Sequence, residues 1–186
     1  CSMFGVVLAS APCLIICLVI LQTEPGTLPM LTLTGTLTLK GGTHTARNVT
    51  VAENANVTFA SGSYKGATID GTATVKEGVT FTDASVEVNG TLNAKGGTFT
   101  GNVKFNGSSI ANISGGSFNN EKKYGGVTFD YNVTGTITGG TFTFADFYTT
   151  KVKLSGGTFT MIKTNGDRKL ADLLAEGAAY YGASDN

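Results

Sequence analysis

The stretch Ile113-Ser114-Gly115-Gly116-Ser117-Phe118 belongs to a series of related six-residue segments that decides the fold. Each segment has an apolar residue, a polar residue, two glycines, a hydroxyl residue and an aromatic ring, and further copies begin at Ala94, Ile137 and Leu154. Degenerate copies run from Leu39 to His44, from Phe59 to Tyr64 and from Lys76 to Phe81. The segment therefore returns along most of the chain, at intervals that are similar but unequal.

A constant segment at unequal spacing is typical of a solenoid, whose loops vary in length while its strands stack. We therefore expect one ring from each coil to join an internal ladder, formed by His44, Tyr64, Phe81, Phe99, Phe118, Phe142 and Phe159. His44 is the sole histidine of the chain, and we interpret it as a ladder member rather than as a general base.

Short strands and sharp corners alternate over residues 31–164. Leu31-Thr32-Leu33-Thr34 and Thr36-Leu37-Thr38-Leu39 alternate apolar and hydroxyl residues, which is typical of strands with one buried face. Pairs such as Asn89-Gly90 and Asn106-Gly107 separate the apolar stretches, and their glycines accept the positive φ that a sharp corner demands.

Two folds fit short strands separated by turns. An antiparallel sandwich or barrel has strands at similar spacing, but it gives no reason for one segment to return again and again along the chain. A parallel β-helix does, because coils about 4.8 Å apart stack equivalent residues in ladders. The prediction is an all-β fold: a single-stranded parallel β-helix, or β-solenoid, of about six to seven coils with a short C-terminal capping helix.

The N-terminal end differs from the repeats. Residues 1–24 form an apolar segment, in which the run from Met3 to Leu21 carries no charge. The length of this run fits a membrane anchor, the core of a signal peptide, or a buried cap of the solenoid. No Lys or Arg precedes the run and Pro12 interrupts it, so these alternatives stay open. Residues 25–30, rich in proline and glycine, are expected to be a linker.

The C-terminal residues 165–186 also change character. Asp167 is a candidate N-cap for a helix over about Arg168 to Glu176, with Gly177 as the residue after it. The apolar face of this helix would carry Leu170, Leu173 and Leu174. An open solenoid end recruits other chains, so we expect this helix to cover it. A linker helix that leads to a further domain is the alternative.

Composition excludes several classes of function. The 13 basic and 13 acidic residues balance, whereas nucleic-acid binding needs a clustered excess of Lys and Arg. The three cysteines, Cys1, Cys13 and Cys17, all precede the repeats, so we expect no metal cluster built on cysteine there. The acidic residues show no common position in the repeats, and we predict no catalytic residues, cofactor or metal.

Aromatic side chains outside the ladder are the candidate ligand contacts. Some follow Phe142 closely and others flank the longest gap between repeats, where inserts protrude and rings offer stacking surfaces. These candidates are Tyr124, Tyr131, Phe144, Phe147 and Tyr148. Local packing of the same rings over the coil is the alternative.

The Gly-Gly-Thr-Phe repeats and the tail resemble a known class of proteins. The tail reads Lys169-Leu170-Ala171-Asp172-Leu173-Leu174-Ala175-Glu176-Gly177 and continues into Ala178-Ala179-Tyr180-Tyr181. Over residues 31–182 the chain resembles the β-solenoid repeat regions of large, adhesin-like, secreted or wall-attached surface proteins of Gram-positive gut bacteria. The resemblance implies an extracellular or cell-surface location, a structural or adhesive role, and glycans or host proteins as partners.

Three functions therefore compete. The first is a non-enzymatic extracellular solenoid that serves as a stalk or a binding surface, attached to a membrane or wall through its N-terminal segment or flanking domains. The second is a polysaccharide-active enzyme of the pectate-lyase type, which needs convergent carboxylates. The third is an ice-binding face built from Thr32, Thr34, Thr36 and Thr38, which needs flat threonine rows over several coils. The Thr-x-Thr pairs are not expected to keep one position.

Overall fold

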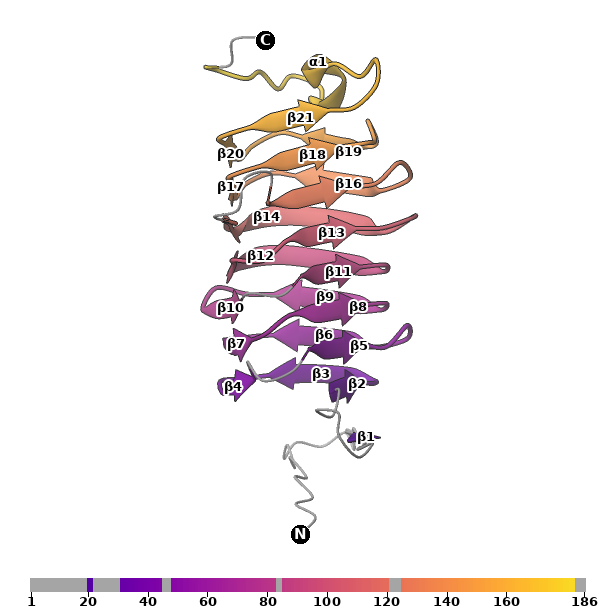
Figure 1. Cartoon of the computed structure of the whole chain (residues 1–186), viewed down its shortest axis with the longest axis vertical. Helices are drawn as coiled ribbons and strands as arrows, with labels where there is room; N and C mark the ends of the chain where they lie inside the picture. Colours follow the sequence, from indigo (N-terminus) through magenta and orange to yellow (C-terminus); the bar gives the residue numbers. More distant parts are fainter. Residues whose placement is uncertain (1–19, 22–30, 45–47, 83–84, 121–124, 183–186) are drawn as a thin grey trace.

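A computed structural model describes residues 20–21, 31–44, 48–82, 85–120 and 125–182 of the chain. It is a parallel β-solenoid of about seven coils, stacked along the long axis of the molecule (Figure 1). Each coil contributes three strands to three faces, and every strand pair between successive coils is parallel, as between β5 (Val49–Val51) and β8 (Ala67–Ile69). The predicted fold class is confirmed.

The three faces follow one another along each coil. The first face consists of β2 (Leu31–Leu33), β5, β8, β11 (Val86–Val88), β13 (Val103–Phe105), β15 (Val127–Phe129), β18 (Ala145–Phe147) and β21 (Ile162–Thr164). The second face consists of β3 (Thr36–Leu39), β6 (Asn56–Phe59), β9 (Thr72–Val75), the first halves of β12 (Thr91–Phe99) and β14 (Ile110–Phe118), β16 (Thr134–Ile137) and β19 (Val152–Leu154). The third face consists of β4 (Thr43–His44), β7 (Gly62–Tyr64), β10 (Val79–Phe81), the second halves of β12 and β14, β17 (Thr141–Phe142) and β20 (Thr158–Phe159).

The predicted ring ladder lies inside the third face. The strand register places its seven residues opposite one another from coil to coil, beginning with His44 opposite Tyr64. The rings from Phe81 to Phe159 stack with centroids 4.5–5.3 Å apart and planes within 13° of parallel. Tyr64 is fully buried, and this burial raises the pKa of its phenol. The side chain of His44 lies outside the part that the structure describes.

A second ring ladder lies inside the first face. Phe105, Phe129 and Phe147 are all fully buried and stack with centroids 5.1 and 4.6 Å apart. Val51, Ile69 and Val88 occupy the same register position in earlier coils, so aliphatic side chains continue this column toward the N-terminal end. The core is therefore a continuous column of inward side chains, and successive coils keep their register because a slip would expose it.

The glycine pairs of the repeats form the corner between the second and third faces. There β12 and β14 run around the bend without interruption, and their register shifts at Lys95. Gly116 has φ +102°, and a Cβ at this position would lie 2.8 Å from the carbonyl oxygen of Gly96 in the coil below. The corner therefore needs glycine both for its backbone conformation and for the close approach of the coils.

The two ends of the solenoid carry different structures. Ile20–Leu21 (β1), at the end of the apolar N-terminal run, pairs antiparallel with β2. The remaining predictions for residues 1–30, the signal or anchor and the linker, lie outside the described residues. At the other end a short helix, α1 (Leu170–Leu173), lies beyond the last coils (Figure 1).

The C-terminal helix is shorter than predicted. It covers only Leu170–Leu173, and Lys169 rather than Asp167 precedes it, with its N–H donated to the Asp172 carboxylate at 2.9 Å. The chain leaves the helix after Leu173 because Leu174 forms a bridge with Leu154, and the Ala175 N–H donates to the Leu154 carbonyl at 2.8 Å. Strand-like pairing with β19 thus replaces the last helical turns. Leu173 is fully buried against the core, so the segment does cover part of the end.

Candidate functional site

Two of the predicted ligand-contacting aromatics are buried, and the prediction for them is wrong. Phe147 belongs to the second ring ladder, and Phe144 is 7% exposed, with its backbone and Cβ packed against Gly126. The chain around them is not a protruding insert, because Ala145–Phe147 forms strand β18 of the first face. Tyr124 lies outside the described residues. The alternation Val103/Phe105 and Val127/Phe129 was the sequence signal for the second ladder.

The other two candidates, Tyr131 and Tyr148, come together at one corner. Tyr131 follows β15 and Tyr148 follows β18, so both leave the first face at its edge toward the second face, one coil apart. Their ring centroids are 5.4 Å apart and their planes are inclined by 60°. Tyr131 is 59% exposed and Tyr148 is half-buried. The two rings form a tilted aromatic surface, which we call the tyrosine corner.

Charged side chains from the next coil surround the tyrosine corner. The guanidinium carbon of Arg168 lies 5.5 Å from the Tyr131 ring centroid, and Lys163 Nζ lies 5.9 Å from that of Tyr148. Both distances are within the range of cation–π contact. Lys163 also forms an ion pair at 3.4 Å with Asp146, a carboxylate that additionally accepts a hydrogen bond from Asn165. Arg168 and Lys163 could not be assigned to this corner from the sequence, because both are distant along the chain from Tyr131.

The register of the strands brings hydroxyl groups into rows on the third face. The residue before each ring is Thr or Ser in all seven coils: Thr43, Ser63, Thr80, Thr98, Ser117, Thr141 and Thr158. The residue after each ring forms a second row, which contains Thr82, Thr100, Asn119, Thr143 and Thr160. Each member of the second row donates its N–H to the carbonyl of the ring residue one coil below. We call these two rows the hydroxyl strip.

The hydroxyl strip corrects one expectation in part. Thr-x-Thr pairs flank the inward rings Phe81, Phe99, Phe142 and Phe159 and share one position of the third face. The other Thr-x-Thr pairs lie elsewhere, as expected. Thr36 and Thr38, by contrast, lie on the second face, where rows in register also contain Asn56, Ile110 and Asn112. The sequence-based hypothesis placed the threonine rows in the alternation of residues 31–38, whereas the hydroxyl strip lies on either side of the buried rings.

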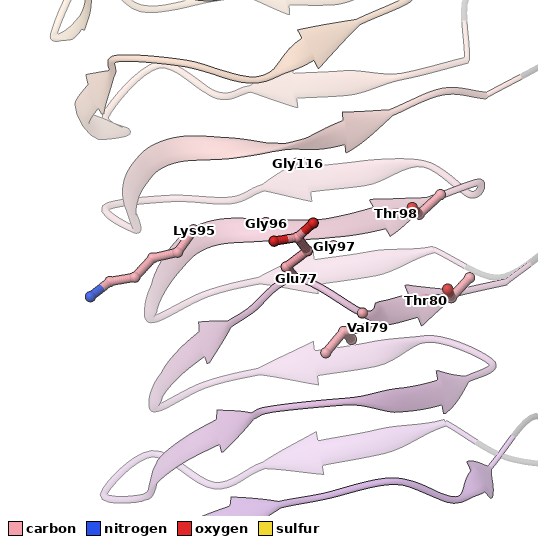
Figure 2. A pocket seen from close by; sticks show the side chains of 9 residues that line it. Glu77, Val79, Thr80, Lys95, Gly96, Gly97, Thr98 and Gly116 are labelled. Atoms are coloured by element: carbon pink, nitrogen blue, oxygen red, sulfur yellow. The ribbon is translucent and has the colours of Figure 1, made fainter.

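A shallow groove runs along the glycine corner beside the strip. Figure 2 shows the side chain of Glu77 beside Gly96 and Gly97, Thr80 and Thr98 further along their strands, and Lys95 directed away from the ribbon. Glycines leave the groove without side chains on its floor. It therefore offers backbone polar groups, the neighbouring hydroxyls and the Glu77 carboxylate to a ligand.

Some acidic residues share positions, contrary to the sequence analysis. Glu87 and Asp146 occupy one outward position of the first face, and Asp70 and Asp130 occupy one position at its edge. Each pair is three coils apart, which is roughly 14 Å at the spacing of stacked strands. Paired carboxylates of glycoside hydrolases lie about 5–9.5 Å apart. Neither pair fits that chemistry.

Asp70 and Asp130 instead have structural partners. The carboxylate of Asp70 accepts a hydrogen bond from Asn89 at 2.7 Å, and Asn106 donates to Asn89 at 3.1 Å, so these side chains form a polar ladder along the corner. Asp130 accepts the N–H of Tyr131 at 2.8 Å. Within the described ranges no group of three His, Cys, Asp or Glu side chains is arranged to hold a metal ion. The same part of the chain contains no helix of sufficient length and hydropathy to span a bilayer.

Comparison with known proteins gives no indication of function. No protein-family model matches the chain, and neither the curated proteins nor the solved structures gave a match. What the structure establishes is the β-solenoid fold.

Proposed function

We propose that this chain is a non-enzymatic, extracellular β-solenoid that displays a binding surface for glycans or proteins on a rigid rod at a cell surface. The observation that carries the proposal is the tyrosine corner, two tyrosines held one coil apart at the edge of stacked strands with Tyr131 mostly exposed. Aromatic rings that remain exposed beside cations are typical of binding surfaces.

The rigidity of the rod supports this function. Two internal ring ladders and parallel pairing throughout seven coils hold outward side chains at fixed intervals of about 4.8 Å, so the rod is on the order of 30 Å long. Sites on such rigid elements keep their geometry when a ligand pulls on them. The resemblance of the repeats to adhesin-like surface proteins points in the same direction.

The experiment is a binding array. The full chain, fluorescently labelled, is applied to immobilised glycans and extracellular proteins, beside a Tyr131→Ala variant and a Tyr181→Ala control, since Tyr181 is 97% exposed at the C-terminal end. We expect at least one ligand that the wild type and Tyr181→Ala bind and Tyr131→Ala does not. Binding that is identical for all three proteins, or no binding to any ligand, would contradict the proposal.

The enzymatic alternative is tested in the same preparation. Polygalacturonate is incubated with the chain in the presence of Ca²⁺, and cleavage is followed by the absorbance of unsaturated products and by reducing ends. We expect none, because the carboxylates that share a position are too far apart to act together. Sustained turnover by the purified chain, lost in an Asp146→Asn or a Glu87→Gln variant, would overturn the non-enzymatic assignment.

The hydroxyl strip favours a second candidate function, binding to an ice surface. Residues two positions apart along a strand lie about 6.6 Å apart, and neighbouring coils lie about 4.8 Å apart. From Thr80 to Thr160 the strip is therefore a regular, uncharged lattice of hydroxyl groups, in which Asn119 alone contributes an amide. A crystal surface is recognised by such repetition. Thermal hysteresis of the full chain is the assay, with Thr141→Tyr in the strip and Thr128→Tyr on the first face as the matched control. Absence of hysteresis at high concentration would exclude this function.

A further inference from the structure

The tyrosine corner carries positive charge that no carboxylate of the described residues neutralises. Within those residues no carboxylate lies within 4.0 Å of the Arg168 guanidinium, whose recorded contacts are the Tyr131 ring and the Asn165 carbonyl oxygen, to which Nη1 donates. Lys151, three residues after Tyr148 in the connection between β18 and β19, donates to the Asn132 side-chain oxygen at 3.4 Å and likewise has no carboxylate partner in the described part of the chain. Neither cation is therefore paired with a carboxylate of these residues.

The carboxylates near the corner are already engaged. Asp146 is 8% exposed and is held by Lys163 and Asn165, so its charge is balanced within the fold. Asp130 is directed to the backbone N–H of Tyr131, a hydrogen bond that stabilises the carboxylate where it lies.

The polar ends of the tyrosines are available as well. Within the described ranges the hydroxyl groups of Tyr131 and Tyr148 form no hydrogen bond to another protein group, and the exposed fraction of Tyr131 leaves much of its ring accessible. A phenol with a free hydroxyl can donate and accept hydrogen bonds while its ring offers an apolar face. The corner thus combines an apolar platform, two phenolic hydroxyls and a guanidinium.

We propose that the tyrosine corner binds a carboxylated saccharide, with the sugar ring on Tyr131 and its carboxylate on the guanidinium of Arg168. The chemistry follows from the parts: a pyranose has an apolar face that packs on an aromatic ring, and a guanidinium presents paired N–H donors that match a carboxylate. A neutral sugar would leave the free donors of Arg168 unused. This inference rests on the proposed binding function and names the class of ligand for that site.

The test uses a matched pair of ligands. Trigalacturonate and its fully methyl-esterified form have the same sugar rings and differ in the charge of their carboxyl groups, and each is titrated calorimetrically into the full chain. We expect the free acid to bind about tenfold or more tightly than the ester, since hydrogen bonds to charged groups stabilise more than those to neutral ones. The affinity of the acid should also fall as salt concentration rises.

Variants assign the two contributions. Arg168→Gln should lower the affinity for the acid to that for the ester and leave the ester unchanged, whereas Tyr131→Ala should weaken both ligands. Arg168→Lys, which keeps the charge and loses the planar fork, should give an intermediate affinity for the acid. Lys95→Gln and Tyr181→Ala, at exposed positions outside the corner, are the controls and should bind as the wild type does. Circular dichroism checks that each variant is folded.

The outcomes separate this inference from the function on which it rests. Equal affinity for acid and ester, no effect of Arg168→Gln, or no heat from either trisaccharide would each overturn the carboxylated-saccharide assignment. If the array then shows a protein or a neutral glycan whose binding is lost in Tyr131→Ala, the binding function stands with another ligand class. If the array also shows no ligand dependent on Tyr131, both proposals fail.

Discussion

Replacing Phe118 by alanine should remove the centre of the ring ladder. Phe118 is 1% exposed and stacks with Phe99 at 4.6 Å and with Phe142 at 4.8 Å, with interplanar angles of 4° and 1°. Burial of the side chain contributes about 1.5–3 kcal/mol, and each aromatic contact adds about 0.5–1.5 kcal/mol. These contributions agree with the loss of about 3–5 kcal/mol that Phe→Ala substitutions in cores produce.

Phe159→Ala is the matched control within the same ladder. Phe159 occupies the same register position in the last coil, is partly exposed, and has one stacking neighbour, Phe142, at 4.5 Å. With one contact and incomplete burial, its loss should be on the order of 1–2.5 kcal/mol. The difference between the two variants thus measures the second stacking contact together with the remaining burial.

The assay is urea unfolding of the wild type and both variants, followed by circular dichroism. We expect both midpoints to fall, that of Phe118→Ala more, with the dependence on denaturant unchanged, since a changed slope would indicate that the coils no longer unfold together. A loss below about 1 kcal/mol for Phe118→Ala would refute the ladder as a source of stability. Equal losses for the two variants would refute the argument that stacking on both sides matters.

Three further predictions concern the corner, the phenol and the end of the solenoid. Gly116→Ala should destabilise by more than about 2 kcal/mol, because its Cβ would meet the coil below at a positive φ, whereas Gly107→Ala, at φ +53° with open space, should cost about 1–2 kcal/mol; similar unfolding midpoints would contradict this. Burial raises the pKa of Tyr64 above the ordinary 10.0, so the folded state holds the phenolic proton more tightly than the unfolded state does. The stability that this group contributes is complete below pH 10 and is lost as the pH rises through the raised pKa. Tyr64→Phe should therefore remove this loss of stability at alkaline pH, measured by unfolding at a series of pH values. Deleting residues 167–186 removes the buried Leu173 and the pairing with Leu154, so light scattering should detect concentration-dependent association, and a truncated chain that stays monomeric would contradict the capping role.

The main chain architecture could be predicted from the sequence because a solenoid repeats one local arrangement. The ring of each six-residue segment marks the same point of every coil, so aligning the segments already aligned Tyr64 with Phe81 and Phe118 with Phe142, as the register confirms. The glycine pairs likewise indicated the corner. Both signals depend on spacing along the chain, which is visible without coordinates.

The candidate sites could be predicted only in part. Tyr131 and Tyr148 were identified as exposed rings, but Phe144 and Phe147 were assigned with them because strand β18 carries no copy of the repeated segment. The predicted length of the C-terminal helix was too great, because Leu174 pairs with Leu154. Helix propensity does not include such a contact with the preceding coil. Tertiary pairing overrode the local preference at both places.

By itself, the sequence determined the coil: which ring of each repeated segment points inward, where glycine permits the bend, and that the windings are parallel, because each of these depends on a pattern that returns once in every coil. Only the tertiary structure decided which outward side chains of different coils become neighbours. The tyrosine corner and its cation Arg168, and the hydroxyl strip from Thr43 to Thr158, arise from the register between coils. The physical reason is that the buried rings constrain the inward positions in every coil, whereas the outward positions become neighbours only when the coils stack.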